Sequence, residues 1–390
     1  MPARELDYVL VGGGLQNALI ALALAARPRP PRVALVERDD RLGGNHTWCF
    51  HEDDVPAPLR PVLAPLVAHR WPGYEVRFPG LRRRLAGEYS AIPSGRLDEV
   101  LRARFEALGW PLHLGRAATA VAADRVTLEG GEVITARVVI DARGPDRASA
   151  SPDAAGFQKF VGVELELARP HGLVEPVLMD ATVEQRDGYR FVYVLPMGPT
   201  RALVEDTYFS SGPALDRDAV RERCLAYARA SGLEPAEVVR EEHGVLPMPW
   251  KVSGEPRPGR EGPLLAGYQG GWFHPATGYS LPAAARLAAL VGEVPAERLF
   301  GRELDELAAA MRRQARFFCQ LNRLLFRWFA PGERWQVLAR FYQLPDPTIR
   351  RFYAMDLGTL DRARLLVGRP PRGLSLRARL AGGHGPEEAA

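Results

Sequence analysis

The chain has 390 residues, of which 46% are hydrophobic and 25% are charged, enough for one large globular domain or two closely joined ones. Its formal net charge of +4 is small for this length and argues against a protein that binds nucleic acid through its overall charge. Three widely spaced cysteines argue against a zinc site or a disulfide framework and suit a reducing cytoplasm.

The first predicted unit covers residues 8–37 and consists of a buried strand, a glycine turn, a helix and a second strand. Gly12 permits the tight turn, and Gly14 lets the backbone approach a pyrophosphate at the N-terminus of the helix, where free N–H groups attract anions. Asn17 stands in the place of a third glycine. Glu37, 23 residues after Gly14, is placed to bind a ribose hydroxyl. The whole unit therefore predicts a dinucleotide site.

Three later segments favour FAD over NAD. A glycine-rich loop at residues 41–45 follows the second strand, and a further predicted strand at residues 138–141 ends in an acid and a glycine. A late strand at residues 264–266 precedes a helix, residues 281–291, whose N-terminus points back at the cofactor. Together these segments resemble the split FAD-binding domain of the glutathione-reductase and hydroxylase type, in which an arginine on an early helix often contacts the cofactor. The residues predicted to contact FAD are Gly12, Gly14, Asn17, Glu37, Gly44, Asn45, His46, Arg96, Asp141, Gly144, Gly267, His274, Gly278, Tyr279 and Ser280.

Two of these residues are histidines with an equally good structural interpretation. His46 and His274 each suit either a contact with the cofactor or a role as a hydrogen-bonded structural side chain. The spacing of the histidines does not predict a metal site.

The middle of the chain predicts an antiparallel sheet inserted between the two halves of the nucleotide domain. Alternating residues and turn signals indicate four strands, at residues 160–167, 177–181, 189–196 and 202–209. A sheet that covers the flavin would form a substrate chamber. Glu205 and Asp206 are neighbours on the last strand, so they face opposite ways and at most one points into that chamber. An edge strand with solvated acids remains the alternative.

Residues 312–353 combine helical spacing with ten aromatic residues and nine arginines. This mixture suits an interfacial helix on anionic lipid or a lid over an apolar tunnel, and equally a helical bundle with a solvated arginine face. No segment has the roughly 20 apolar residues that a spanning helix needs.

The predicted organisation is an FAD-binding part at 1–150, a sheet domain at 151–255, an FAD-binding return segment at 256–295, a helical region at 296–375 and a disordered tail at 376–390.

Longer strings identify a family. Gly43 to His51 reads GGNHTWCFH and resembles the GGNHTW segment of bacterial lycopene β-cyclases, with Cys49 where a serine is expected. The resemblance continues in order from about residue 5 to residue 373. The further matching strings are at residues 157–162, 179–183, 189–193, 204–207, 244–247, 274–282, 341–345, 349–353 and 368–371.

The resemblance implies an α/β flavoprotein that binds FAD, needs it reduced by NAD(P)H, and acts with no net redox change. Its substrates would be lycopene and other acyclic carotenes, taken from the membrane by a cytoplasmic enzyme at the membrane surface, with no nucleic-acid partner. The glutamate of the family's acidic motif corresponds to Glu205, and the adjacent acid to Asp206. The implied product is β-carotene, formed through γ-carotene.

Two other functions fit part of the sequence. A flavin-dependent isoprenoid or carotenoid oxidoreductase, or a hydroxylase, would share the FAD segments but consume NAD(P)H or oxygen in each turnover. A carotenoid-binding protein with a vestigial nucleotide fold would bind pigment and leave it unchanged. The intact pair Glu205 and Asp206 argues against the second.

Overall fold

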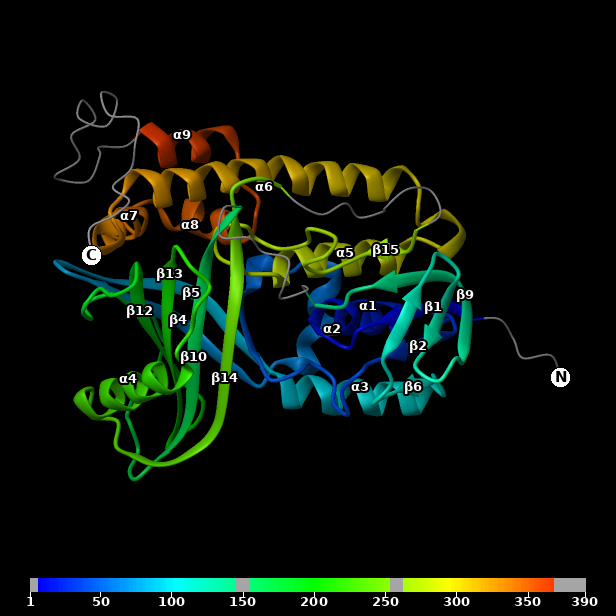
Figure 1. Ribbon diagram of the computed structural model, residues 1–390, viewed down its shortest axis with the longest axis horizontal. Coiled ribbons are helices and arrows are strands. Elements are labelled where there is room, and N and C mark those ends of the chain that lie inside the picture. Colours follow the sequence, from blue (N-terminus) through cyan, green and yellow to red (C-terminus); the bar gives the residue numbers. More distant parts are fainter. Residues whose placement is uncertain (1–5, 145–153, 253–261, 368–390) are drawn as a thin grey trace.

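The computed structural model describes residues 6–144, 154–252 and 262–367, and its strands form two sheets that lie side by side under a layer of helices (Figure 1). The long helix α6 (Arg302–Trp328) crosses above both sheets. The string at 368–371 and the tail predicted at 376–390 lie outside the described residues.

The first sheet carries the predicted nucleotide unit. Its strand order is β6-β2-β1-β9-β8-β7, with β15 beside β9, and the pairs β6–β2, β2–β1, β1–β9 and β9–β15 are parallel. Short, fully apolar runs form such strands because both of their faces are covered. The carboxyl ends meet at one edge, where Val11 pairs with both Val36 and Asp141. The strands are β1 (Leu6–Val11), β2 (Val33–Val36), β6 (Leu112–His113), β7 (Ala118–Val121), β8 (Arg125–Leu128), β9 (Val133–Asp141) and β15 (Leu264–Leu265).

Helix α1 (Leu15–Ala25) is apolar on nearly every side because it is enclosed, with all but its last residue buried. It packs against α5 (Leu281–Glu293), the return helix that the sequence predicts, and against α3 (Ser94–Leu108). Gly292 permits the close approach to α1, since a Cβ atom there would lie 3.0 Å from the Cβ of Ala23. The return segment is thereby held at the carboxyl edge of the first sheet.

The second sheet has the order β14-β10-β13-β12-β11-β4-β5-β3, and each neighbouring pair except β11–β4 is antiparallel. It contains all four predicted strands of the middle segment. Four further strands were not predicted: three lie before residue 150, and β14 lies at the end of the middle segment. The strands are β3 (Thr47–His51), β4 (His69–Phe78), β5 (Leu81–Pro93), β10 (Ala155–Leu167), β11 (Val177–Asp180), β12 (Tyr189–Pro196), β13 (Arg201–Ser210) and β14 (Pro235–Pro249).

The two faces of this sheet differ in what covers them. Helix α4 (Arg217–Ala230) covers the outer face, where its Cys224 and Ala228 join a cluster with Val161, Val163 and Val204. The residues between these on the same strands, such as Leu203 and Glu205, face a cavity between the two sheets.

The C-terminal region is helical, as predicted, but half of its ten aromatic residues are buried. Phe318 and Tyr342 are fully buried, and Phe317, Phe341 and Phe352 are at most 8% exposed. Within the described residues, no helix is both long enough and apolar enough to cross a bilayer. The helices here are α6, α7 (Arg334–Phe341), α8 (Asp346–Tyr353) and α9 (Thr359–Val367). The remaining short helices of the described residues are η1 (Glu52–Asp54), η2 (Ala57–Leu59), α2 (Arg60–Leu63), η3 (Ala64–Leu66), η4 (Ala296–Arg298) and η5 (Pro331–Glu333).

Candidate active site

The glycine turn after β1 forms one end of the site. Gly12 has a φ of +93°, and a Cβ atom there would lie 2.9 Å from the carbonyl oxygen of Ala142, so only glycine fits. A Cβ atom on Gly14 would meet no atom within 4 Å, which leaves open space before the N-terminus of α1. Glu37 accepts a hydrogen bond of 2.6 Å from the backbone N–H of Gly13. This geometry fits a pyrophosphate at the helix N-terminus and a ribose beside Glu37.

Asn17 acts on the turn itself. It is fully buried, and its Nδ2 donates to the carbonyl oxygens of Val11 and Gly12 at 3.0 and 2.9 Å. Asn17 therefore fixes the conformation of the turn and does not line the cavity in front of it.

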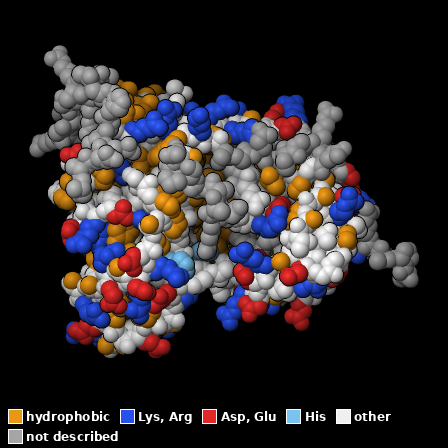
Figure 2. Space-filling model, viewed as in Figure 1, with side chains coloured by type: hydrophobic (Ala, Val, Ile, Leu, Met, Phe, Trp, Pro, Cys, Tyr) orange, Lys and Arg blue, Asp and Glu red, His pale blue; other side chains and the backbone are white. Residues whose placement is uncertain are grey.

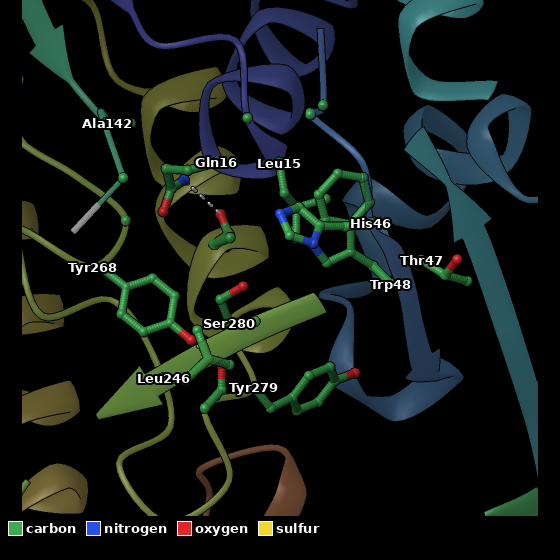
Figure 3. Close-up of a pocket in the computed structure, with 18 of the residues that line it drawn as sticks. Leu15, Gln16, His46, Thr47, Trp48, Ala142, Leu246, Tyr268, Tyr279 and Ser280 are labelled. Carbon is green, nitrogen blue, oxygen red and sulfur yellow. Dashed lines mark hydrogen bonds between the residues drawn. The ribbon is translucent and has the colours of Figure 1, made fainter. Parts of the chain in front are cut away.

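A cavity of about 710 Å³ extends from this turn between the two sheets. Figure 3 shows side chains from three parts of the chain around it: Gln16 of α1, His46, Thr47 and Trp48 at the start of β3, and Tyr268, Tyr279 and Ser280 of the return segment. The predicted site residues that line this cavity are Gly12, Gly14, Glu37, Gly44, His46, Gly144, Glu205, Gly267, Gly278, Tyr279 and Ser280.

The other predicted cofactor residues lie outside the cavity lining. Arg96 donates to the carbonyl oxygen of Pro65 at 2.9 Å and pairs with Glu99 at 2.8 Å. Asp141 pairs with the guanidinium of Arg143, which does line the cavity, at 2.7 Å. The positions of Arg96 and Asp141 therefore do not support the predicted contacts of these two residues with FAD.

His274 is a buried structural side chain in this fold. Its Nε2 lies 3.0 Å from the carbonyl oxygen of Phe352 in α8, and its Nδ1 accepts from the N–H of Ala276 at 3.1 Å. Burial lowers the pKa of His274 to about 3, so the ring is neutral. His274 ties the return segment to α8 and does not line the cavity.

Glu205 stands beside a second carboxylate that the sequence did not single out. On β10, Gly162 pairs with Glu205 of β13 on one side and with Glu242 of β14 on the other. A Cβ atom on Gly162 would lie 3.0 Å from Cγ of Glu242 and 3.4 Å from Oε2 of Glu205. The glycine therefore leaves room for both carboxyl groups on the cavity face of the sheet.

The two carboxyl groups have different partners. Burial raises the pKa of Glu205 to about 8, and the charge of Glu242 acts in the same direction. The Thr207 hydroxyl, which donates to Glu205 at 2.8 Å, opposes the rise. Burial also raises the pKa of Glu242, but Arg240, 2.7 Å away, opposes that rise. Arg240 thus favours the charged form of Glu242, while Glu205 holds its proton near neutral pH.

Asp206 lies on the opposite face of β13, away from this pair. Arg190 donates to its two oxygens at 2.8 and 3.0 Å, and the Tyr208 hydroxyl donates at 2.6 Å. Asp206 is fully buried and is absent from the cavity lining.

The segment around β3 closes the chamber. β3 and β14 are the two edges of the second sheet, yet side chains join them. Arg240 of β14 donates to Thr47 at 2.7 Å and to Asn45 at 3.0 Å, and Asn45 donates to the backbone of Glu241 at 2.5 Å. Thr47 also donates to Glu242 at 3.2 Å. Asn45 thus closes the curled sheet and does not itself line the cavity.

Comparison with known families decides the class of protein. A family model described as lycopene cyclase protein matches residues 7–379. The chain belongs to the lycopene cyclase family. It is 44% identical to the lycopene beta-cyclase of Pseudescherichia vulneris over 98% of each chain. It is 43% identical to that of Pantoea ananas, over 94% of this chain and 95% of the relative.

Solved structures agree on the fold of this cyclase. A probable FAD-dependent monooxygenase from Pseudomonas aeruginosa superposes with a TM-score of 0.60 at 17% identity, covering 87% of this chain and 100% of the other. A geranylgeranyl bacteriochlorophyll reductase-like protein from Thermoplasma acidophilum gives 0.58 at 13% identity, covering 97% and 99%. These neighbours confirm the predicted fold class, a Rossmann-type α/β fold of the kind found in FAD-dependent enzymes.

The structure adds residues to the cyclase site that sequence reasoning missed. Glu242 was missed because β14 carries charged residues at neighbouring positions and gave no clear strand pattern. The alternation of Arg240, Glu242 and Gly244 was the available signal, since these residues share one face of a strand. The cavity is also lined by aromatic residues from several elements, which no single segment reveals: Trp48, Tyr89, Phe160, Tyr193 and Tyr353.

Proposed function

We propose that this chain is a lycopene β-cyclase that converts the acyclic end groups of lycopene to β-ionone rings, giving β-carotene through γ-carotene. The observation that carries this proposal is Glu205, a carboxyl group with a pKa of about 8 in an aromatic-lined chamber continuous with the nucleotide turn. Such a group is a proton donor at neutral pH, and the reaction begins with the protonation of an alkene. The 42–44% identity to bacterial lycopene beta-cyclases supports the same activity.

The chain's own residues would perform the chemistry as follows. Glu205 donates its proton to the terminal double bond of the carotene, and the next double bond attacks the resulting tertiary cation to close a six-membered ring. The apolar walls exclude water, which would otherwise trap the cation as an alcohol. Tyr89, Tyr193 and Tyr353 line the chamber, and aromatic rings beside that cation would stabilise it. Loss of one proton from the ring restores a double bond, so the reaction has no net redox change.

The nucleotide end fits FAD by the geometry of its turn. Gly12, Gly14 and Glu37 would hold the pyrophosphate and ribose, and Gly44, Gly267 and Gly278 would border the remainder of the cofactor. FAD in its reduced, anionic form, obtained with NAD(P)H, would supply a fixed negative charge beside the developing cation.

We place the enzyme in the cytoplasm, peripherally bound to the membrane. Its proposed substrate is insoluble in water, and the exposed side of α6 carries a row of arginines (Figure 2), including Arg316, Arg323 and Arg327. Apolar side chains are exposed nearby, with Trp328 at 39% and Val367 at 82%. Sedimentation with vesicles containing anionic lipid tests this, and protein that stays wholly in the supernatant would contradict it.

Expression in a bacterium that accumulates lycopene tests the function. We expect γ-carotene and β-carotene to appear by pigment chromatography with the wild-type chain, and lycopene to remain with Glu205→Gln. Purified enzyme should consume no stoichiometric NAD(P)H or oxygen, whereas an oxidoreductase would consume one equivalent per turnover. An unchanged lycopene peak with soluble, FAD-loaded wild-type protein would refute the proposal.

A further inference from the structure

The chamber contains a second group suited to proton transfer, the imidazole of His51. It ends β3, lines the cavity, and is 7% exposed. Its Nε2 has no hydrogen-bond partner among the described residues, and Asp54 is the residue recorded beside its Nδ1. Buried nitrogens without partners are uncommon and call for an explanation.

Other histidines of the chain show what a structural role requires. Both ring nitrogens of His274 are occupied, by the carbonyl oxygen of Phe352 and the N–H of Ala276. His171 likewise has one ring nitrogen 2.6 Å from the carbonyl oxygen of Gly198, while the other accepts from the N–H of Leu173. Nε2 of His51 lacks such a partner although the ring is similarly enclosed, so hydrogen bonding within the fold does not account for this nitrogen.

The buried carboxylate of Asp54 lies beside Nδ1 of His51. Oδ2 of Asp54 is 3.4 Å from Nδ1 of His51, and Asp54 is 1% exposed. The same oxygen accepts from the backbone N–H of His51 at 2.8 Å and from the hydroxyl of Tyr279 at 2.6 Å. These two bonds fix the carboxylate beside the ring. A carboxylate at Nδ1 orients an imidazole, leaves Nε2 as the basic atom, and stabilises the imidazolium that forms.

Aromatic rings surround His51, as expected of a site that stabilises a cation. Tyr89, Tyr74 and Tyr353 surround the imidazole with ring centroids 5.0, 5.3 and 5.7 Å away. Tyr89 and Tyr353 also line the cavity, as does Tyr279. Aromatic faces stabilise a positive charge whether it lies on a substrate carbon or on an imidazolium.

We propose that His51, held by Asp54, is the base that removes the ring proton in the last step of cyclisation. This inference rests on the proposed function. Glu205 gives one proton to the terminal alkene carbon, the ring-closing C–C bond forms, and Nε2 of His51 takes the proton from the carbon at the new ring junction. The C–H electron pair becomes the ring double bond. The carboxylate of Glu205 and the imidazolium of His51 then return to their starting states by taking up and releasing one proton each.

The position of a base decides which alkene forms. The cation before the last step has hydrogens on three neighbouring carbons: the ring junction, a ring methylene and a methyl group. Loss from the first gives the β ring, and loss from the others gives a double bond elsewhere in the ring or outside it. A side chain with only a structural role would alter rate or stability but would not change this choice.

The test compares the ring types formed by His51→Gln and by the control His69→Gln. His69 lies on β4 outside the cavity lining, so the control should retain wild-type products. We expect His51→Gln to bind FAD normally by its absorbance, to form β rings about 10²-fold more slowly, and to release rings with displaced double bonds. Formation of β rings alone, at any rate, would overturn the inference.

If His51→Gln forms no cyclic product at all, a second variant tests the inference. Added imidazole should restore cyclisation by FAD-loaded His51→Ala, because the free base fits the space that the side chain leaves. Arrest without rescue would overturn the inference. Failure of the proposed function looks different, because the wild-type chain would then leave lycopene unchanged.

Discussion

Replacing Glu205 with glutamine should abolish cyclisation and, at neutral pH, stabilise the fold. The carboxyl group has an ordinary pKa of 4.5 and a pKa of about 8 in the folded chain. Between these pH values the folded chain keeps a proton on Glu205 that the unfolded chain releases. The contribution of Glu205 to the free energy of unfolding therefore falls as the pH rises from 4.5 to 8. Each pH unit is worth about 1.4 kcal/mol, so holding Glu205 protonated costs about 3 kcal/mol at pH 7. Glutamine has the same shape and carries no such cost.

Urea unfolding of the FAD-loaded wild type and Glu205→Gln, at several values between pH 5 and pH 8, measures this difference. We expect the variant to be about 3 kcal/mol more stable at pH 7, with the gap narrowing towards pH 5. Glu166→Gln is the matched control, because Glu166 is ion-paired with Arg201 and its pKa is lowered, so its loss should bring no stabilisation. A stability gap that does not change with pH would refute the reasoning.

Three further predictions concern Glu205, its neighbour Glu242 and the ion pair on the opposite face of β13. Turnover should fall as the pH rises through about 8, because Glu205 must be protonated, and a pH–rate profile at saturating carotene checks this alkaline limb. Glu242→Gln should move that alkaline limb to lower pH, since the neighbouring charge helps to hold the pKa of Glu205 up; an unmoved limb would show that burial alone sets it. Arg190→Met should destabilise the fold by up to about 3 kcal/mol in urea, because buried Asp206 loses the guanidinium that donates to both of its oxygens and keeps only Arg223, 3.5 Å away, while the pH limb of any folded enzyme stays in place.

The sequence predicted best what depends on neighbouring residues. The turn at Gly12, the strands around it and the distance to Glu37 belong to one continuous segment, and the structure has all of them. Asn17 and His274 were placed near the cofactor because they lie within cofactor motifs. Their side chains instead hold the backbone of those motifs, through bonds to Val11 and Phe352. A motif shows where the chain must be held in shape, but not which of its side chains face outward.

What the sequence missed depends on contacts between distant segments. Glu242 is separated from Glu205 by 37 positions and meets it only because both strands flank Gly162. The aromatic residues at the C-terminal end were equally ambiguous. An amphipathic helix alternates aromatic residues with arginines in the same way whether its apolar side lies on a membrane or against a protein core. The burial of Phe318 and Tyr342 shows that many of these aromatic residues belong to the core.

Glu205 and Asp206 show how one strand gives two adjacent carboxyl groups different chemistry. The alternation of β13 turns Glu205 towards the chamber, where burial and Glu242 raise its pKa and keep it protonated. It turns Asp206 towards α4, where Arg190 and Tyr208 donate hydrogen bonds to its oxygens. A shift of one residue in register would exchange these environments and remove the proton donor from the chamber. The ion pair of Asp206 with Arg190 on the neighbouring strand β12 therefore supports the acid indirectly, because it resists such a shift at the position next to Glu205.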